Sequence, residues 1–157
     1  MWIIIVIVLA LIAAAALSLW NDKRKMQANY RELGLDAPGA RVVDCAGPMF
    51  RFAVKPEEGI AWVVSGLKVP PVSIPLADIA GCEFLDGGRR PYGLGGALVG
   101  EAAASALGGK NGGSVLRILR KDPDSAPVEY RLDRSTYYED FRLFAKEVKE
   151  LIEEFAE

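Results

Sequence analysis

The strongest constraint on the fold of this chain is an uncharged apolar run at its start. Nineteen of the first 20 residues are apolar, the exception being Ser18, and all Lys, Arg, Asp and Glu residues follow them. As a helix rising about 1.5 Å per residue, Trp2 to Trp20 would span roughly 28 Å, close to the hydrocarbon thickness of a bilayer. The run therefore predicts one transmembrane anchor, residues 1–20, with Trp2 and Trp20 at the two headgroup regions.

The charges beside this run predict its orientation. No Lys or Arg precedes the apolar residues, whereas a basic flank follows within the stretch over which the positive-inside rule operates. The flank consists of Lys23, Arg24, Lys25 and Arg31. We therefore expect a single-pass protein of the inner membrane, with its N-terminus outside and its C-terminal part in the cytoplasm. The alternative is a cleaved signal peptide, since Ala14, Ala15 and Ala16 resemble a small-residue cleavage site, although a basic segment is missing before the run.

The composition of the whole chain excludes several classes of chemistry. It contains no His and two Cys, which excludes Ser-His-Asp and Cys-His catalysis, His-containing zinc sites and a four-thiolate site. The formal net charge of −2 argues against nucleic acid as a partner. We expect no enzyme activity, no cofactor and no metal. In the cytoplasm Cys45 and Cys82 should be reduced and serve as small core residues, whereas in the periplasm they could form a disulfide.

The residues after the anchor divide into a stalk, 21–38, and a domain, 39–157. The stalk is polar with scattered apolar residues, and we expect it to continue the helix until Gly34 and Pro38-Gly39 interrupt it. From Arg41 onwards, short runs rich in β-forming residues are separated by turn residues, the pattern of a small antiparallel sheet or barrel. Strands are predicted at 41–46, 49–54, 60–65, 71–76, 79–85, 114–120 and 127–133.

A helix is predicted at the end of the chain. Thr136 and Glu139 have the spacing of a capping box at its start. Apolar residues then recur at steps of three and four and form one stripe along the helix. We expect this stripe to cover the β domain, the alternative being a coiled-coil partner helix. The stripe consists of Tyr137, Phe141, Phe144, Val148, Leu151 and Phe155.

A glycine-rich insertion, residues 87–113, separates the fifth and sixth predicted strands and holds ten of the 16 glycines. It does not match a nucleotide-binding loop: Gly109-Lys110 has Ala104 where the first Gly belongs, and Asn111 where a hydroxyl belongs. Small residues four apart would instead line one helix face and allow close packing with a partner or another helix, the alternative being a flexible loop. These residues are Gly96, Gly100, Ala104 and Gly108. Arg89 and Arg90 are candidates for contact with anionic lipid or an acidic partner.

The stretch around the fourth and fifth predicted strands resembles a known family. Val72-Ser73-Ile74-Pro75-Leu76-Ala77-Asp78-Ile79, which runs on to Cys82-Glu83-Phe84, is similar to a motif of the pleckstrin-homology-like (PH-like) domains of bacterial proteins. The resemblance covers about residues 40–156. It implies a mainly β fold, a partly closed antiparallel barrel of about seven strands capped by a C-terminal α-helix. It also implies a module for recognition and not for catalysis.

Two functions follow from these patterns. The first is a non-enzymatic, membrane-anchored accessory or scaffold protein, whose cytoplasmic PH-like domain binds a protein partner or forms a homo-oligomer. The alternative is a peripheral sensor of anionic lipid, which would use the basic juxtamembrane residues together with Arg89 and Arg90. A hydrolase built on carboxylates alone ranks last, because the sequence contains no motif that would pair two carboxylates in a pocket.

Overall fold

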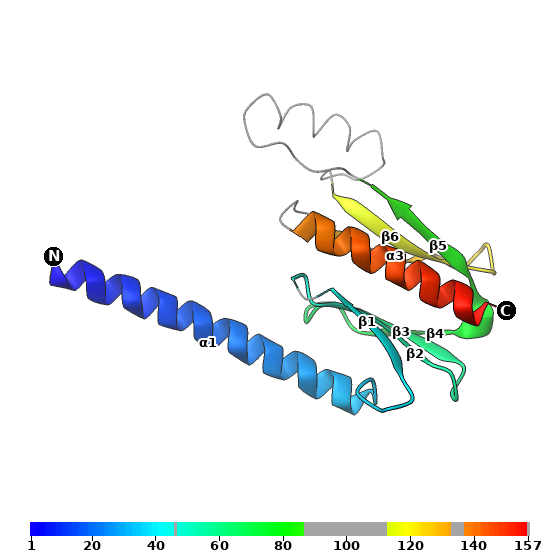
Figure 1. The fold of residues 1–157 in the computed structure, drawn as a ribbon, viewed down its shortest axis with the longest axis horizontal. Coiled ribbons are helices and arrows are strands. Elements are labelled where there is room, and N and C mark those ends of the chain that lie inside the picture. Colours follow the sequence, from blue (N-terminus) through cyan, green and yellow to red (C-terminus); the bar gives the residue numbers. More distant parts are fainter. Residues whose placement is uncertain (46, 87–112, 133–136, 157) are drawn as a thin grey trace, which may run out of the picture. The chain divides into compact units, whose positions relative to one another are not determined.

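The computed structural model describes residues 1–45, 47–86, 113–132 and 137–156. It contains two compact units, Met1–Pro38 and Gly39–Glu157. The first unit holds one long helix, and the described residues of the second form seven strands and a C-terminal helix (Figure 1).

The first unit is built around helix α1, Trp2–Glu32, which continues without interruption past the apolar run. It ends at Leu33, and Gly34 then takes a φ of 68° that favours glycine. The Leu35 N–H donates to the Tyr30 carbonyl at 2.8 Å, and the Gly34 N–H donates to the Arg31 carbonyl at 3.1 Å. This pair of bonds is the Schellman arrangement that terminates helices. The helical stalk and its interruption at Gly34 are as the sequence predicts.

The second unit contains two antiparallel sheets, in which consecutive strands are neighbours. All seven strands lie within one residue of their predicted limits wherever the structure describes them. The first sheet consists of β1 (Arg41–Cys45), β2 (Phe50–Lys55), β3 (Ile60–Ser65) and β4 (Val72–Pro75), and the second of β5 (Ile79–Leu85), β6 (Ser114–Arg120) and β7 (Val128–Leu132). A short 3-10 helix, η1 (Leu76–Asp78), connects the two sheets.

Helix α3, Tyr138–Phe155, lies between the two sheets and covers the core (Figure 1). Its buried residues include four members of the predicted stripe, joined by Ala145 and Ile152. The stripe is therefore occupied within its own domain, and the coiled-coil alternative is wrong. Tyr137 precedes the helix as its N-cap without a side-chain capping bond, and its side chain is exposed. The predicted cap residue Thr136 lies outside the described residues.

The predicted fold class needs one correction. The two sheets remain open and separate, and the described residues form no closed barrel. The chain leaves the first sheet at Pro75, which has no backbone N–H to donate, and η1 carries it to the second sheet. The helices, of 31 and 18 residues, contain more of the described chain than the strands do, so the fold is mixed α and β. The arrangement of the second unit is compatible with a PH-like fold.

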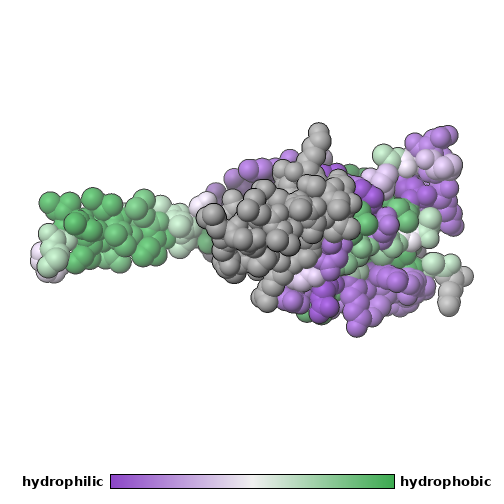
Figure 2. Space-filling view, turned by 90° about the horizontal axis from the view of Figure 1, so that it is seen from above, coloured by the Kyte–Doolittle hydropathy of each residue, from purple (hydrophilic) through white to green (hydrophobic). Residues whose placement is uncertain are grey.

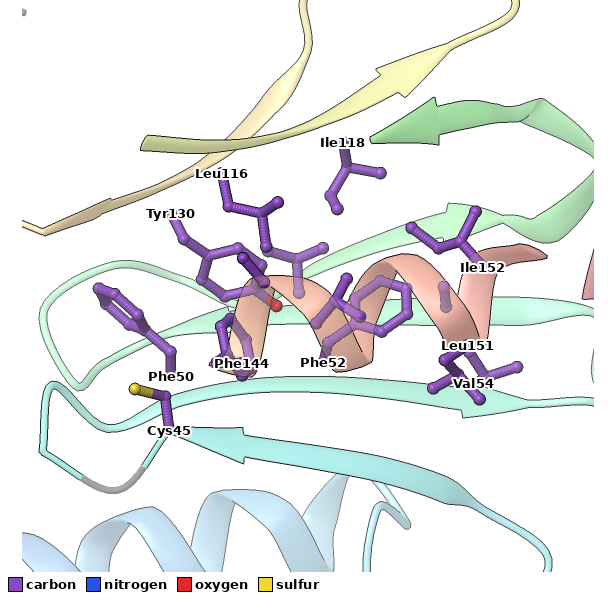
Figure 3. Close-up of a cluster of buried hydrophobic side chains, with 14 of the residues drawn as sticks. Cys45, Phe50, Phe52, Val54, Leu116, Ile118, Tyr130, Phe144, Leu151 and Ile152 are labelled. Carbon is purple, nitrogen blue, oxygen red and sulfur yellow. The ribbon is translucent and has the colours of Figure 1, made fainter. Parts of the chain in front are cut away.

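Tyr130 connects both sheets and the helix at the centre of the core (Figure 3). Its side chain is fully buried, and its hydroxyl donates to the backbone carbonyl of Arg51 in β2 at 2.6 Å. Its ring centroid lies 5.3 Å from that of Phe50, and 5.1 Å from that of Phe144 in an edge-on arrangement. The alternation of apolar residues in the strands and helix predicts a core of Phe50, Phe52, Trp62, Phe84, Leu116, Ile118 and Phe144. All of these except Trp62 belong to the core cluster or pack against it, whereas Trp62 is only partly buried and lies outside it.

Replacing Tyr130 by Phe should lower the free energy of unfolding by about 1–2 kcal/mol, because a buried hydrogen bond between the sheets is lost while the ring remains. Urea unfolding of the full chain in detergent, followed by near-ultraviolet circular dichroism, measures the change. Tyr137→Phe is the matched control, because that side chain is exposed, and its stability should be unchanged. Equal stability of Tyr130→Phe and the unaltered chain would show that the bond contributes nothing.

Candidate functional site: the anchoring helix and its basic flank

The first 20 residues of the chain expose apolar side chains on every side of α1. Each of them is exposed, and the most apolar stretch of the helix has a mean hydropathy of 3.0 with none of it buried (Figure 2). A helix that packs on a domain concentrates its apolar residues on one face, as α3 does. By length and composition, α1 is a helix that could cross a membrane. Trp2, the first residue of this helix, is 82% exposed.

The other end of the apolar segment carries an aromatic ring and a charge in contact. The Arg24 guanidinium carbon lies 4.7 Å from the centroid of the Trp20 ring, an arrangement with cation–π character. The two residues are four apart, the spacing that places side chains together on a helix surface. An indole and a guanidinium side by side suit the headgroup region, which accepts both apolar rings and positive charge.

Three consecutive basic residues, Lys23, Arg24 and Lys25, form what we call the basic collar. All three are exposed. Because successive residues of an α-helix point about 100° apart, these three side chains spread over about 200° of the helix surface and do not form a narrow patch. Arg31, the fourth residue of the predicted flank, is exposed in the last turn of α1. The collar therefore presents positive charge over more than half of the helix circumference, just beyond Trp20.

The glycine-rich insertion joins neighbouring ends of two paired strands. Leu85, the last residue of β5, is the register partner of Val115 in β6, so the chain returns beside the point from which it departs. Two contacts are predicted within this insertion: helix packing by the small residues, and binding of anionic lipid or an acidic partner by the arginines. Both stay predictions, because their residues lie outside the described part of the chain. These residues are Arg89, Arg90, Gly96, Gly100, Ala104 and Gly108.

The start of α3 is tied to the end of β5, where this insertion begins. The Tyr138 hydroxyl donates to the Asp86 carboxylate at 2.6 Å. This hydrogen bond, together with partial burial, raises the pKa of Tyr138 above its usual value. The phenol thus remains a proton donor to Asp86 across the physiological range, and the pair serves to hold the two elements together.

The two cysteines are free thiols that lie in different sheets. Burial, with contributions from Asp140 and Asp44, raises the pKa of the Cys45 thiol to about 11. Burial also raises the pKa of Cys82, which is partly exposed. Thiols that stay protonated at neutral pH are poor nucleophiles and poor metal ligands. Their predicted role as small core residues is supported.

A row of ion pairs crosses the second sheet. Arg117 of β6 lies between Glu83 of β5 and Glu129 of β7, with N–O distances of 3.9 and 2.8 Å, and Arg131 also contacts Glu129 at 2.7 Å. Burial opposes ionisation of Glu129, but the hydrogen bonds and charges of Arg131 and Arg117 outweigh it and lower the pKa of this carboxyl. Glu129 is therefore held as an anion and is poorly suited to act as a general acid. Within the described ranges, no group of three potential metal ligands occurs.

Replacing Glu129 by Gln should destabilise the chain by about 1 kcal/mol at neutral pH. The pKa of Glu129 lies below its usual 4.5 in the folded state, so its contribution is complete above that value and is lost as the pH falls through the lower folded pKa. The difference between the two proteins should therefore shrink on acidification below pH 4.5. Denaturation midpoints measured at several pH values test this. Glu57→Gln, in the exposed loop after β2, should show no such convergence.

Comparisons of the chain with protein-family models, with curated proteins and with solved structures find no match. The functional argument therefore rests on the chain's own features. These are a helix that could cross a membrane, a basic collar beside it, and a domain with an arrangement compatible with a PH-like fold.

Proposed function

We propose that this chain is a single-pass, membrane-anchored accessory or scaffold protein without enzyme activity. Its PH-like domain faces the cytoplasm at the inner membrane and binds a protein partner or a second copy of itself. The observation that carries this proposal is the change of surface along α1, whose first 20 residues are uniformly apolar and exposed and are followed by the exposed basic collar.

Anchoring and orientation have a common physical basis. Hydrocarbon removes the apolar surface of α1 from water, the dominant favourable term for inserting such a helix. The collar favours the leaflet with anionic headgroups, where each basic side chain contributes about 1 kcal/mol. Trp20 and Arg24, in contact with each other, lie where apolar and charged surroundings meet.

The chemistry of the domain supports recognition over catalysis. The chain has no His, its thiols are held protonated, and Glu129 is held ionised by two Arg side chains. These groups stabilise the sheets and the core, and none is placed to exchange a proton with a bound molecule. We therefore expect this domain to act by binding a partner at its surface.

The exposed basic collar also favours a second candidate, the sensor of anionic lipid. If the chain is such a sensor, its activity depends on anionic lipid, and replacing Lys23, Arg24 and Lys25 together by Gln should abolish that dependence. The domain should then bind no protein partner. The scaffold function predicts instead that this triple variant, once inserted into the membrane, still binds its partner.

The orientation can be tested with one engineered cysteine. Gln27→Cys, introduced into a Cys45→Ala, Cys82→Ala background, places a thiol at an exposed position of α1 beyond the collar. A membrane-impermeant maleimide should not label it in intact cells and should label it after lysis. Trp2→Cys in the same background is the matched control, and it should be labelled in intact cells. The reverse pattern would contradict the cytoplasmic orientation.

The scaffold function itself is tested by purification of the full chain after mild detergent solubilisation and chemical cross-linking. A partner or a second copy should be recovered in fixed stoichiometry. A control chain, in which α1 is fused to an unrelated soluble domain, should recover neither. A monomer without any cross-linked companion, from membranes in which the anchored chain is abundant, would refute the proposal.

A further inference from the structure

Strand β1 is the outer strand of the first sheet, bonded to β2 on one side. Within the described residues it has no strand partner on its other side. An outer strand directs alternate backbone N–H and C=O groups away from its neighbour, where they are available to another extended chain. The side chains of Arg41 and Val42, in the first part of the strand, are exposed.

A groove of about 280 Å³ runs between this strand and helix α3. One side is formed by the beginning of β1 and the other by the last turns of α3. Val43 and Leu151 contribute apolar surface to it. The groove is lined by Arg41, Val42, Val43, Glu147, Glu150, Leu151 and Glu154.

The helix side of the groove is acidic. Glu154 is already neutralised, because both of its carboxylate oxygens accept hydrogen bonds from the Arg41 guanidinium, at 2.8 and 3.0 Å. Glu150 has only an exposed contact with Lys146, at 3.8 Å. Glu147 forms no ion pair with any residue that the structure describes. Two carboxylates, Glu147 and Glu150, therefore remain to attract positive charge.

We infer that this groove binds an extended basic segment of a partner protein, which adds to the edge of β1 as a further strand. The backbone of the segment would pair with β1, and its Lys or Arg side chains on one face would reach Glu147 and Glu150. Like charges disfavour two other occupants of this groove: the same groove of a second copy would bring two acidic walls together, and an anionic lipid would be repelled. This inference rests on the proposed function and deepens it, because it names the class of partner and the surface that binds it.

The charge requirement is tested with labelled peptides and the full chain in neutral detergent, by fluorescence anisotropy. A short peptide that alternates lysine and valine should bind, more weakly as salt increases. The same peptide with glutamate in place of lysine should not bind. Equal binding of both peptides, or failure of the basic peptide to bind at low salt, would overturn the inference.

The backbone requirement is tested with the same basic peptide methylated at alternate amide nitrogens. Its charge is unchanged, but methylation along one edge removes the N–H donors that a strand partner needs. We expect methylation along one of its two edges to abolish binding and along the other to preserve it. Undiminished binding of both methylated peptides would show simple charge attraction and would overturn strand addition.

The position of the groove is tested with a double variant, Glu147→Gln with Glu150→Gln, which should bind the basic peptide about tenfold more weakly. Glu153→Gln is the matched control, because this exposed glutamate lies on the same helix outside the groove lining. Its affinity should be unchanged. Unchanged affinity of the double variant, with circular dichroism showing that it is folded, would overturn the assignment.

Competition separates this inference from the proposed function. If a cross-linked partner is recovered equally by the unaltered chain and by the double variant, and the basic peptide does not displace it, the scaffold function stands and the groove is refuted. If no partner is recovered but the peptide binds as described, the groove stands and the scaffold function is refuted.

Discussion

Among the described residues of the second unit, the two sheets share no strand pairing, and their arrangement depends on what fills the space between them. Tyr130 carries a hydrogen bond from β7 to the backbone of β2, and its ring packs on Phe50 and Phe144. Because the phenol belongs to one sheet, its acceptor to the other, and one ring neighbour to the helix, a single buried side chain connects all three layers. The hydroxyl adds direction to what would otherwise be nondirectional apolar packing.

Helix α3 has different residues for its two environments. Its apolar stripe completes the core, while most of its other positions carry charged side chains in contact with solvent. Along one flank, glutamates face the outer strand of the first sheet across the groove, where Glu154 also holds Arg41 at the start of β1. The helix that stabilises the domain thereby provides one wall of this groove, so the position of that wall is determined by the packing of the core.

Much of this architecture could be predicted from local patterns. The alternation of Phe50, Phe52 and Val54 predicts strand β2, and the three- and four-residue steps through Phe141, Phe144 and Val148 predict helix α3. Gly34 marks the end of α1 because only a residue tolerant of positive φ fits there.

Other features depend on contacts between distant residues and leave no local pattern. The pairing of Arg41 with Glu154 joins residues 113 apart in the chain, and the bond from Tyr130 to Arg51 joins residues 79 apart. Trp62 is apolar, yet it lies outside the central cluster, because its position in β3 alternates with that of the buried Ala61 and Val63. The groove was missed for the same reason: its two walls come from opposite ends of the domain sequence. The nearest signal is the spacing of Glu147, Glu150 and Glu154 along one side of a helix.

The continuous helix α1 has a further consequence for the reach of the domain. The part of α1 beyond Trp20, twelve residues long, extends for about 18 Å as a helix, and only a short connection follows before β1 begins at Arg41. A helical spacer does not collapse or stretch as a flexible linker does. With the apolar segment in a bilayer, the limited length of this connection would keep the domain within a layer next to the membrane. Partners tethered in that layer would meet it at a high effective concentration, and proteins free in the surrounding volume would meet it far less often.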